Sequence, residues 1–71
     1  MKKEEDLIYE LIFSEENKFS IDISEYVEDI YQYSEFILKI KSILKKSKVK
    51  VEKSNIVRDS KTVIWELKVK K

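Results

Sequence analysis

Lysine recurs at alternate positions in the last third of the chain, a spacing that could bring several positive charges together. Lys48 and Lys50 are two residues apart, as are Lys68 and Lys70, and the single arginine, Arg58, lies between the two pairs. Residues two apart on a β-strand share a face of the sheet, so we expect the lysine side chains to project together. A basic strand face can neutralise nucleic-acid phosphates without reading the base sequence.

Other features of this basic segment favour an ordinary solvated surface. It offers one arginine for bidentate phosphate contacts and no aromatic side chain on the lysine face for base stacking. Lysine also protects exposed sheet edges against pairing with other chains. Nucleic-acid binding by Lys48, Lys50, Lys68, Lys70 and Arg58 is therefore the alternative function that the sequence predicts.

Residue types that perform catalysis or bind metals are scarce. The chain contains no histidine, cysteine or glycine, which excludes histidine general bases, thiolate nucleophiles, Cys/His zinc sites and glycine-rich phosphate loops. Neighbouring carboxylates, such as Glu15 with Glu16, lack the spacing of a calcium-binding loop. We expect no enzyme activity, no catalytic or metal-binding residue, no cofactor and no small-molecule substrate.

Residues 24–46 form the longest periodic stretch of the sequence. Apolar and aromatic residues recur there at spacings of three and four, which puts them on one stripe of an α-helix. The stripe consists of Tyr26, Ile30, Tyr33, Ile37, Ile40 and Leu44. No glycine or proline interrupts it, so the pattern predicts one helix about 33 Å long. Ser24 is the expected N-cap.

A second apolar line on this predicted helix suggests a partner. Val27, Tyr31 and Leu38 lie apart from the main stripe at 100° per residue. We predict a small non-enzymatic protein-binding module, an inhibitor, adaptor or regulator, which uses Tyr31, Leu38, Val27 and Glu35 or self-associates as a homodimer through this surface.

Residues 7–13 fit either a helix or a strand. Residues four apart, such as Leu7 and Leu11, would share a helical face, whereas alternate residues ending at Phe13 would share a strand face. Residues 19–23 alternate strictly between apolar and polar, as in a strand with one buried face. We prefer a β-hairpin, which puts the apolar residues of both segments on one face. An amphipathic N-terminal helix is the alternative.

Residues 48–70 predict a second β-hairpin. The valines of its two strands lie on the same, buried face only if the two residue numbers of each directly opposed pair add up to an even number. A three-residue loop at 58–60 satisfies this condition and opposes Val51 to Leu67. A longer odd loop, or a bulge near Asn55, would satisfy it too.

These elements predict an α+β fold of one domain spanning residues 1–71. The preferred topology is ββαββ, with the long helix on one face of an antiparallel sheet, and αβαββ is the alternative. Trp65, between Val63 and Leu67 on one strand face, is expected to anchor the core. A chain of 71 residues has a small core, so the additional apolar surface buried in a dimer would stabilise the fold.

The distribution of charge and residue types adds expectations about partners and origin. Residues 1–38 hold three lysines and eleven carboxylates, whereas residues 39–71 hold eleven lysines, one arginine and three carboxylates. Such polarity suits internal complementarity, contact between subunits or an acidic partner. The start of the chain lacks a signal-peptide pattern and no apolar run could span a membrane. We expect a cytoplasmic protein with no membrane partner. Its residue usage suits an AT-rich genome, a phage or another mobile element, and in a phage the location would be the host cytoplasm.

Overall fold

The computed structural model describes residues 1–71, except for the side chain of Ile30. In chain order the elements are α1 (Glu4–Phe13), β1 (Lys18–Asp22), the 3₁₀ turns η1 (Ile23–Glu25) and η2 (Ile30–Gln32), α2 (Tyr33–Lys46), β2 (Lys50–Arg58) and β3 (Val63–Lys70). The predicted α+β class is confirmed. The preferred ββαββ order is wrong, because the chain begins with a helix and follows the alternative αβαββ order.

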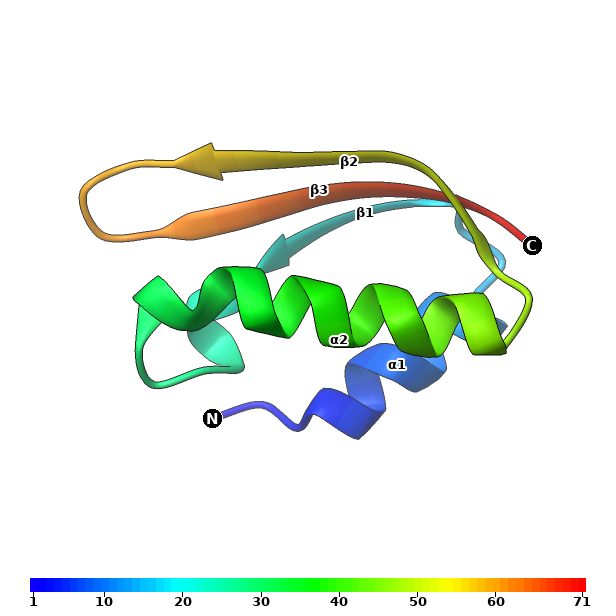
Figure 1. Cartoon of the computed structure of the whole chain (residues 1–71), viewed down its shortest axis with the longest axis horizontal. Helices are drawn as coiled ribbons and strands as arrows, with labels where there is room; N and C mark the ends of the chain where they lie inside the picture. Colours follow the sequence, from blue (N-terminus) through cyan, green and yellow to red (C-terminus); the bar gives the residue numbers. More distant parts are fainter.

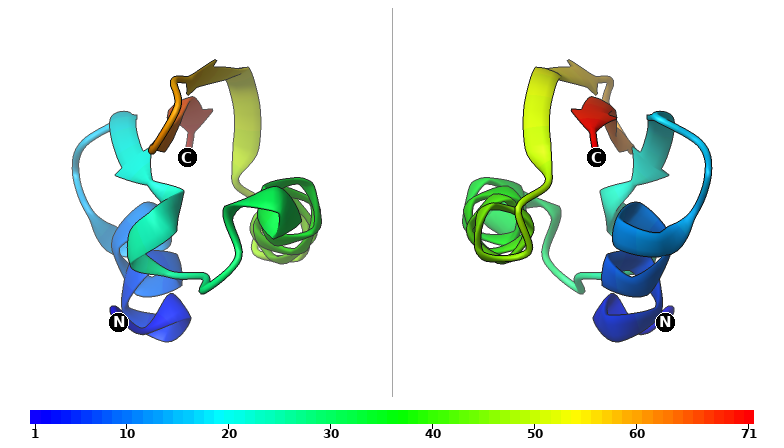
Figure 2. Two further views of the ribbon diagram at one scale, coloured as in Figure 1. Left: turned by 90° about the vertical axis from the view of Figure 1, so that its left-hand side faces the viewer. Right: turned by 90° about the vertical axis from the view of Figure 1, so that its right-hand side faces the viewer.

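The strands form one antiparallel sheet in the order β1-β3-β2, with β3 in the centre. Both helices lie on the same side of this sheet, and the opposite face is open (Figure 1). In the end-on views β1 lies above α1, and β2 lies above α2 (Figure 2). Within the described residues, no helix is both long and apolar enough to cross a membrane.

The core fills the space between the helices and the inner sheet face. Trp65 is fully buried, as predicted, and packs edge-on against Phe36 with ring centroids 6.5 Å apart. Tyr26 also stacks on Phe36, with ring centroids 5.7 Å apart. The indole Nε1–H of Trp65 donates a hydrogen bond of 2.8 Å to the hydroxyl of Ser54, so the one polar atom of the ring is satisfied.

The predicted first hairpin is wrong, because residues 7–13 belong to α1. Leu7 and Leu11 are buried one helical turn apart, and three acidic residues in the first turn suit the positive end of the helix dipole. The helix leaves Tyr9 and Phe13 exposed, although the hairpin would have turned them inward. β1 instead pairs with β3, which sets Ile21 opposite Trp65.

The predicted continuous helix over residues 24–46 is also wrong, because α2 begins only at Tyr33. Carboxylates before it satisfy backbone donors locally: Asp22 accepts from the N–H of Ser24, and Asp29 accepts from the N–H of Tyr31. Such bonds compete with the helical ladder. Asp22 rather than Ser24 is therefore the capping residue, and it caps η1. An unbroken helix over residues 24–46 would be about 33 Å long. This length equals the full 33 Å extent of the molecule along its long axis. Ile30 also belongs to the predicted stripe, but its side chain lies outside the part of the chain that the structure describes.

A bulge sets the register of the C-terminal hairpin. Val51 lies opposite Val69, Lys53 lies opposite Lys68, and the residue between them, Glu52, is the extra one. The predicted three-residue loop at 58–60 is wrong, because the loop has four residues, 59–62. The alternative, a bulge, is present, three positions before Asn55.

The bulge changes which residues of β2 face the core. The predicted pairing of Val51 with Leu67 is wrong, and Val57, expected on the buried face, lies opposite Ile64 on the open face. Ser54 and Ile56 take the inner positions, opposite Leu67 and Trp65.

Candidate functional site

Lysines from all three strands meet on the open sheet face. The register sets Lys68 of β3 between Lys18 of β1 and Lys53 of β2, so three lysines form one row across the sheet. Lys70 and Lys50 form a second lysine row beside the first. We call these five residues, Lys18, Lys50, Lys53, Lys68 and Lys70, the lysine face. Opposed side chains on neighbouring strands have Cβ atoms about 5 Å apart, so the backbone itself holds these charges close together.

No residue of the lysine face forms an ion pair in the described structure. The two ion pairs found there join Lys2 to Glu25 at 3.0 Å and Lys39 to Glu4 at 2.8 Å, both away from the open face. Like charges directly opposite one another destabilise a sheet. The repulsion on the lysine face is therefore offset by solvent and counterions, or by a bound anion.

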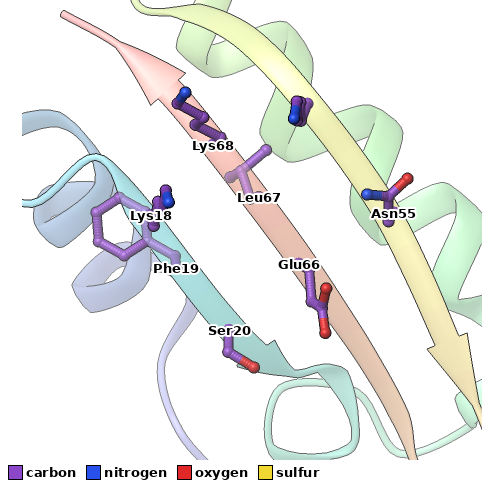
Figure 3. A pocket seen from close by; sticks show the side chains of 8 residues that line it. Lys18, Phe19, Ser20, Asn55, Glu66, Leu67 and Lys68 are labelled. Carbon is purple, nitrogen blue, oxygen red and sulfur yellow. The ribbon is translucent and has the colours of Figure 1, made fainter.

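A shallow trough of about 420 Å³ runs over this face (Figure 3). Its lining residues are Lys18, Phe19, Ser20, Lys53, Asn55, Glu66, Leu67 and Lys68. Its floor lies on paired strands, so a ligand in the trough would meet side chains whose backbone positions are fixed by the sheet.

The predicted nucleic-acid residues divide between two places. Lys50, Lys68 and Lys70 lie on the lysine face, whereas Lys48 lies in the turn between α2 and β2. Arg58 lies opposite Val63 on the inner side of the sheet.

Sequence analysis missed Lys18 and Lys53. Lys18 joins the face because β1 pairs with β3, a long-range contact that the local pattern does not encode. Lys53 joins it because the bulge reverses the strand parity. A count of lysine positions on both sides of a bulge at Glu52 would have found Lys53.

Arg58 takes part in a different surface feature, next to the start of α2. Its guanidinium carbon lies 5.2 Å from the ring centroid of Tyr31 and 5.8 Å from that of Tyr33. Both distances fit cation–π contacts. Tyr31 is 72% exposed, so the outer part of this Arg–Tyr cluster is open to a partner.

The other residues predicted for protein binding do not form one line with Tyr31. Leu38 is exposed on the outer side of α2, and Glu35 is exposed in its first turn. Val27 packs against the core cluster. Their alignment depended on a continuous helix, which the 3₁₀ turns interrupt. Protein binding through this set stays a prediction.

An exposed aromatic pair lies on α1, where the sequence had predicted buried strand residues. The rings of Tyr9 and Phe13 contact each other with centroids 4.8 Å apart, and each side chain is 67% exposed. Acidic residues Glu5, Asp6 and Glu10 surround the pair. The pair lies on the side of α1 opposite the buried Leu7 and Leu11, and so away from the core.

Within the described residues, no three or more acidic side chains are grouped so that they could hold a metal ion. Comparisons of the chain with protein-family models, with curated proteins and with solved structures find no match.

Proposed function

We propose that this protein is a non-enzymatic nucleic-acid-binding module that uses the lysine face. The observation that supports the proposal is the position of five lysines in two adjacent cross-strand rows, without a carboxylate paired to any of them in the described structure. Phosphates supply the missing negative charge, and release of their counterions supplies most of the binding free energy. This was the alternative function predicted from the sequence.

The open sheet gives the proposal its physical basis. Each directly opposed lysine pair costs the fold a few tenths of a kcal/mol in repulsion, which a bound polyanion would reverse. Because the lysines come from three paired strands, their backbone positions are fixed relative to one another. A nucleic-acid backbone that passes along the trough can therefore contact several of them together.

The salt dependence of binding tests this proposal. Five phosphate contacts to a single strand predict that log K falls by about 3.5 for each tenfold rise in salt, so affinity drops about 100-fold between 50 and 200 mM. Fluorescence anisotropy with a labelled oligonucleotide measures this slope. The double substitution Lys53→Glu with Lys68→Glu should weaken binding by more than about tenfold and lower the slope by about 1.4.

A matched variant controls for net charge. Lys3→Glu with Lys61→Glu changes the charge by the same amount, at exposed positions before α1 and in the β2–β3 loop. The control should keep most of the affinity and nearly the full slope. Equal losses in both double variants would mean that only net charge matters, and the lysine face would then not be the site.

Protein binding is the second candidate, and the Arg–Tyr cluster is the observation that favours it. Tyrosine and arginine are enriched at binding hot spots, and the contact with Arg58 limits the freedom of the exposed Tyr31 ring. A partner that docks here should stay bound at high salt and be lost on Tyr31→Asp. It should still bind the Lys53→Glu with Lys68→Glu variant. A partner that dissociates at high salt, still binds Tyr31→Asp and is lost in the lysine double variant would exclude the Arg–Tyr cluster as the binding site.

A further inference from the structure

A row of uncharged and acidic groups lies directly beside the lysine rows. On the open face Glu66 of β3 lies between Ser20 of β1 and Asn55 of β2. All three line the trough, on the same face as Lys18 and Lys68 (Figure 3). None of the three side chains takes part in a hydrogen bond or ion pair found among the described residues.

The open face therefore changes in character along the strands. Two rows of lysine are followed by the Ser20–Glu66–Asn55 row, and then by a row in which Ile64 lies between Asp22 and Val57. Residues two apart on a strand are about 7 Å apart, so each change happens within the size of one nucleotide. Val57 is 52% exposed, which leaves apolar surface beside the polar row.

This gradient orients a bound strand. The Glu66 carboxylate repels phosphate, so the phosphates are held over the lysine rows. The sugar and base then extend across the polar row toward Ile64 and Val57, where the flat faces of bases can lie against apolar side chains. The carboxylate is left facing the edge of a base.

We infer that Glu66 makes the lysine face selective for single-stranded nucleic acid whose bases carry an exocyclic amino group, with cytosine favoured over uracil or thymine. A carboxylate is an acceptor only, and it pairs with the amino group of cytosine. Uracil and thymine present a carbonyl oxygen at the same position, which repels the carboxylate. Single strands are specified because their base edges are open, whereas those of a duplex are paired. This inference rests on the proposed function.

A purely electrostatic role for Glu66 would have a different consequence. If the carboxylate only reduced repulsion among the lysines, then its removal would raise affinity for every strand by the same factor. In the selective role, removal raises affinity for uracil strands most and eliminates the preference. Base discrimination, rather than affinity, therefore separates the two roles.

The experiment compares short oligo(dC) and oligo(dU) of equal length by fluorescence anisotropy at mildly alkaline pH, where cytosine is uncharged. The two probes differ at position 4 of the pyrimidine, which is an amino group in cytosine and a carbonyl in uracil, and at N3, which carries a hydrogen only in uracil. The wild-type chain should bind oligo(dC) about tenfold more tightly. Glu66→Gln should reduce this ratio to near one. The control Glu52→Gln removes a carboxylate from the exposed bulge and should leave the ratio unchanged.

Each remaining outcome decides a different question. Salt-sensitive binding of both probes with equal affinity would overturn the role of Glu66 and leave the proposed function standing. A cytosine preference that survives Glu66→Gln would overturn the assignment to this residue. Absence of binding to either probe at low salt would overturn the proposed function together with the inference.

Discussion

Lys48 has a backbone conformation that glycine normally adopts. Its φ angle is 62°, which places it in the left-handed region. The residue lies just past α2, where the N–H of Val49 donates to the carbonyl of Leu44 and the N–H of Lys48 donates to that of Lys45. These two bonds form a Schellman motif. The strained position matters because Lys48 was one of the lysines predicted to bind nucleic acid.

Replacing Lys48 with glycine should stabilise the protein. A non-glycine residue in this conformation costs about 1–2 kcal/mol, and the greater freedom of glycine in the unfolded chain takes back about half of that. We expect a gain of about 0.5–1 kcal/mol in the free energy of unfolding, measured by urea denaturation with Trp65 fluorescence. The control Lys45→Gly, inside α2, should be destabilising. Because Lys48 lies off the lysine face, Lys48→Gly should also keep nearly full nucleic-acid affinity, and a large loss would contradict that assignment.

At the scale of elements, periodicity predicted what depends on local pattern. The stripe over residues 33–46 is helical, residues 18–22 form a strand, and residues 50–70 form a hairpin. The predictions failed where a single side chain or a long-range contact determines the local backbone structure. Asp22 and Asp29 divert backbone donors from the helix, and no periodicity records that competition.

The site shows the same limit for a different reason. Alternation alone identified Lys50, Lys68 and Lys70, because these residues need only the strand period. The row with Lys18 depends on which strand becomes central, which is a property of the whole sheet. The bulge turns the hydroxyl of Ser54 inward to satisfy the buried indole of Trp65. Parity arguments left a three-residue loop, a longer odd loop and a bulge near Asn55 as alternatives, and they did not decide among them or place the bulge at Glu52.

The loop between β2 and β3 should respond to acid through one carboxylate. Asp59 accepts hydrogen bonds from the backbone N–H groups of Lys61 at 2.9 Å and Thr62 at 2.8 Å, and these bonds hold the pKa of Asp59 below its usual value of 3.8. Its stabilising effect is therefore present above that usual value and is lost as the pH falls through the lowered pKa.

Nuclear magnetic resonance measures this directly. The amide resonances of Lys61 and Thr62 should titrate together with a midpoint below 3.8. In Asp59→Asn the amide oxygen can accept the same bonds but does not ionise, so the shared titration should disappear while the loop stays ordered. A midpoint at or above the usual value would show that the carboxylate does not hold these amides in solution.

At the scale of the whole molecule, a basic surface and an acidic surface lie on opposite sides of the sheet. The lysine face lies at one end of the open sheet surface. On the other side of the sheet, α1 (Figure 1) carries exposed Glu5, Asp6 and Glu10 and the exposed Tyr9–Phe13 pair. The last turn of α1 contains no basic residue. The lopsided charge of the sequence therefore gives an acidic surface on α1 and a basic surface on the sheet, although α2, in the same layer as α1, also carries four lysines. Two such surfaces on one chain are complementary to each other in different copies, which is a head-to-tail contact that need not close into a ring.

This separation predicts self-association that depends on salt. Charges are screened over about 14 Å at 50 mM salt and about 6 Å at 300 mM, so attraction between the lysine face of one copy and α1 of another should be lost over this range. Light scattering should give a mass that rises with concentration above 8.6 kDa at low salt and equals that mass at high salt. The Lys53→Glu with Lys68→Glu variant should be monomeric in both conditions.

Because nucleic acid would occupy the same lysines, an oligonucleotide should dissociate the low-salt assemblies. A dimer that persists at high salt would instead require an apolar contact, for which the exposed Tyr9–Phe13 pair and Leu38 are the available surfaces.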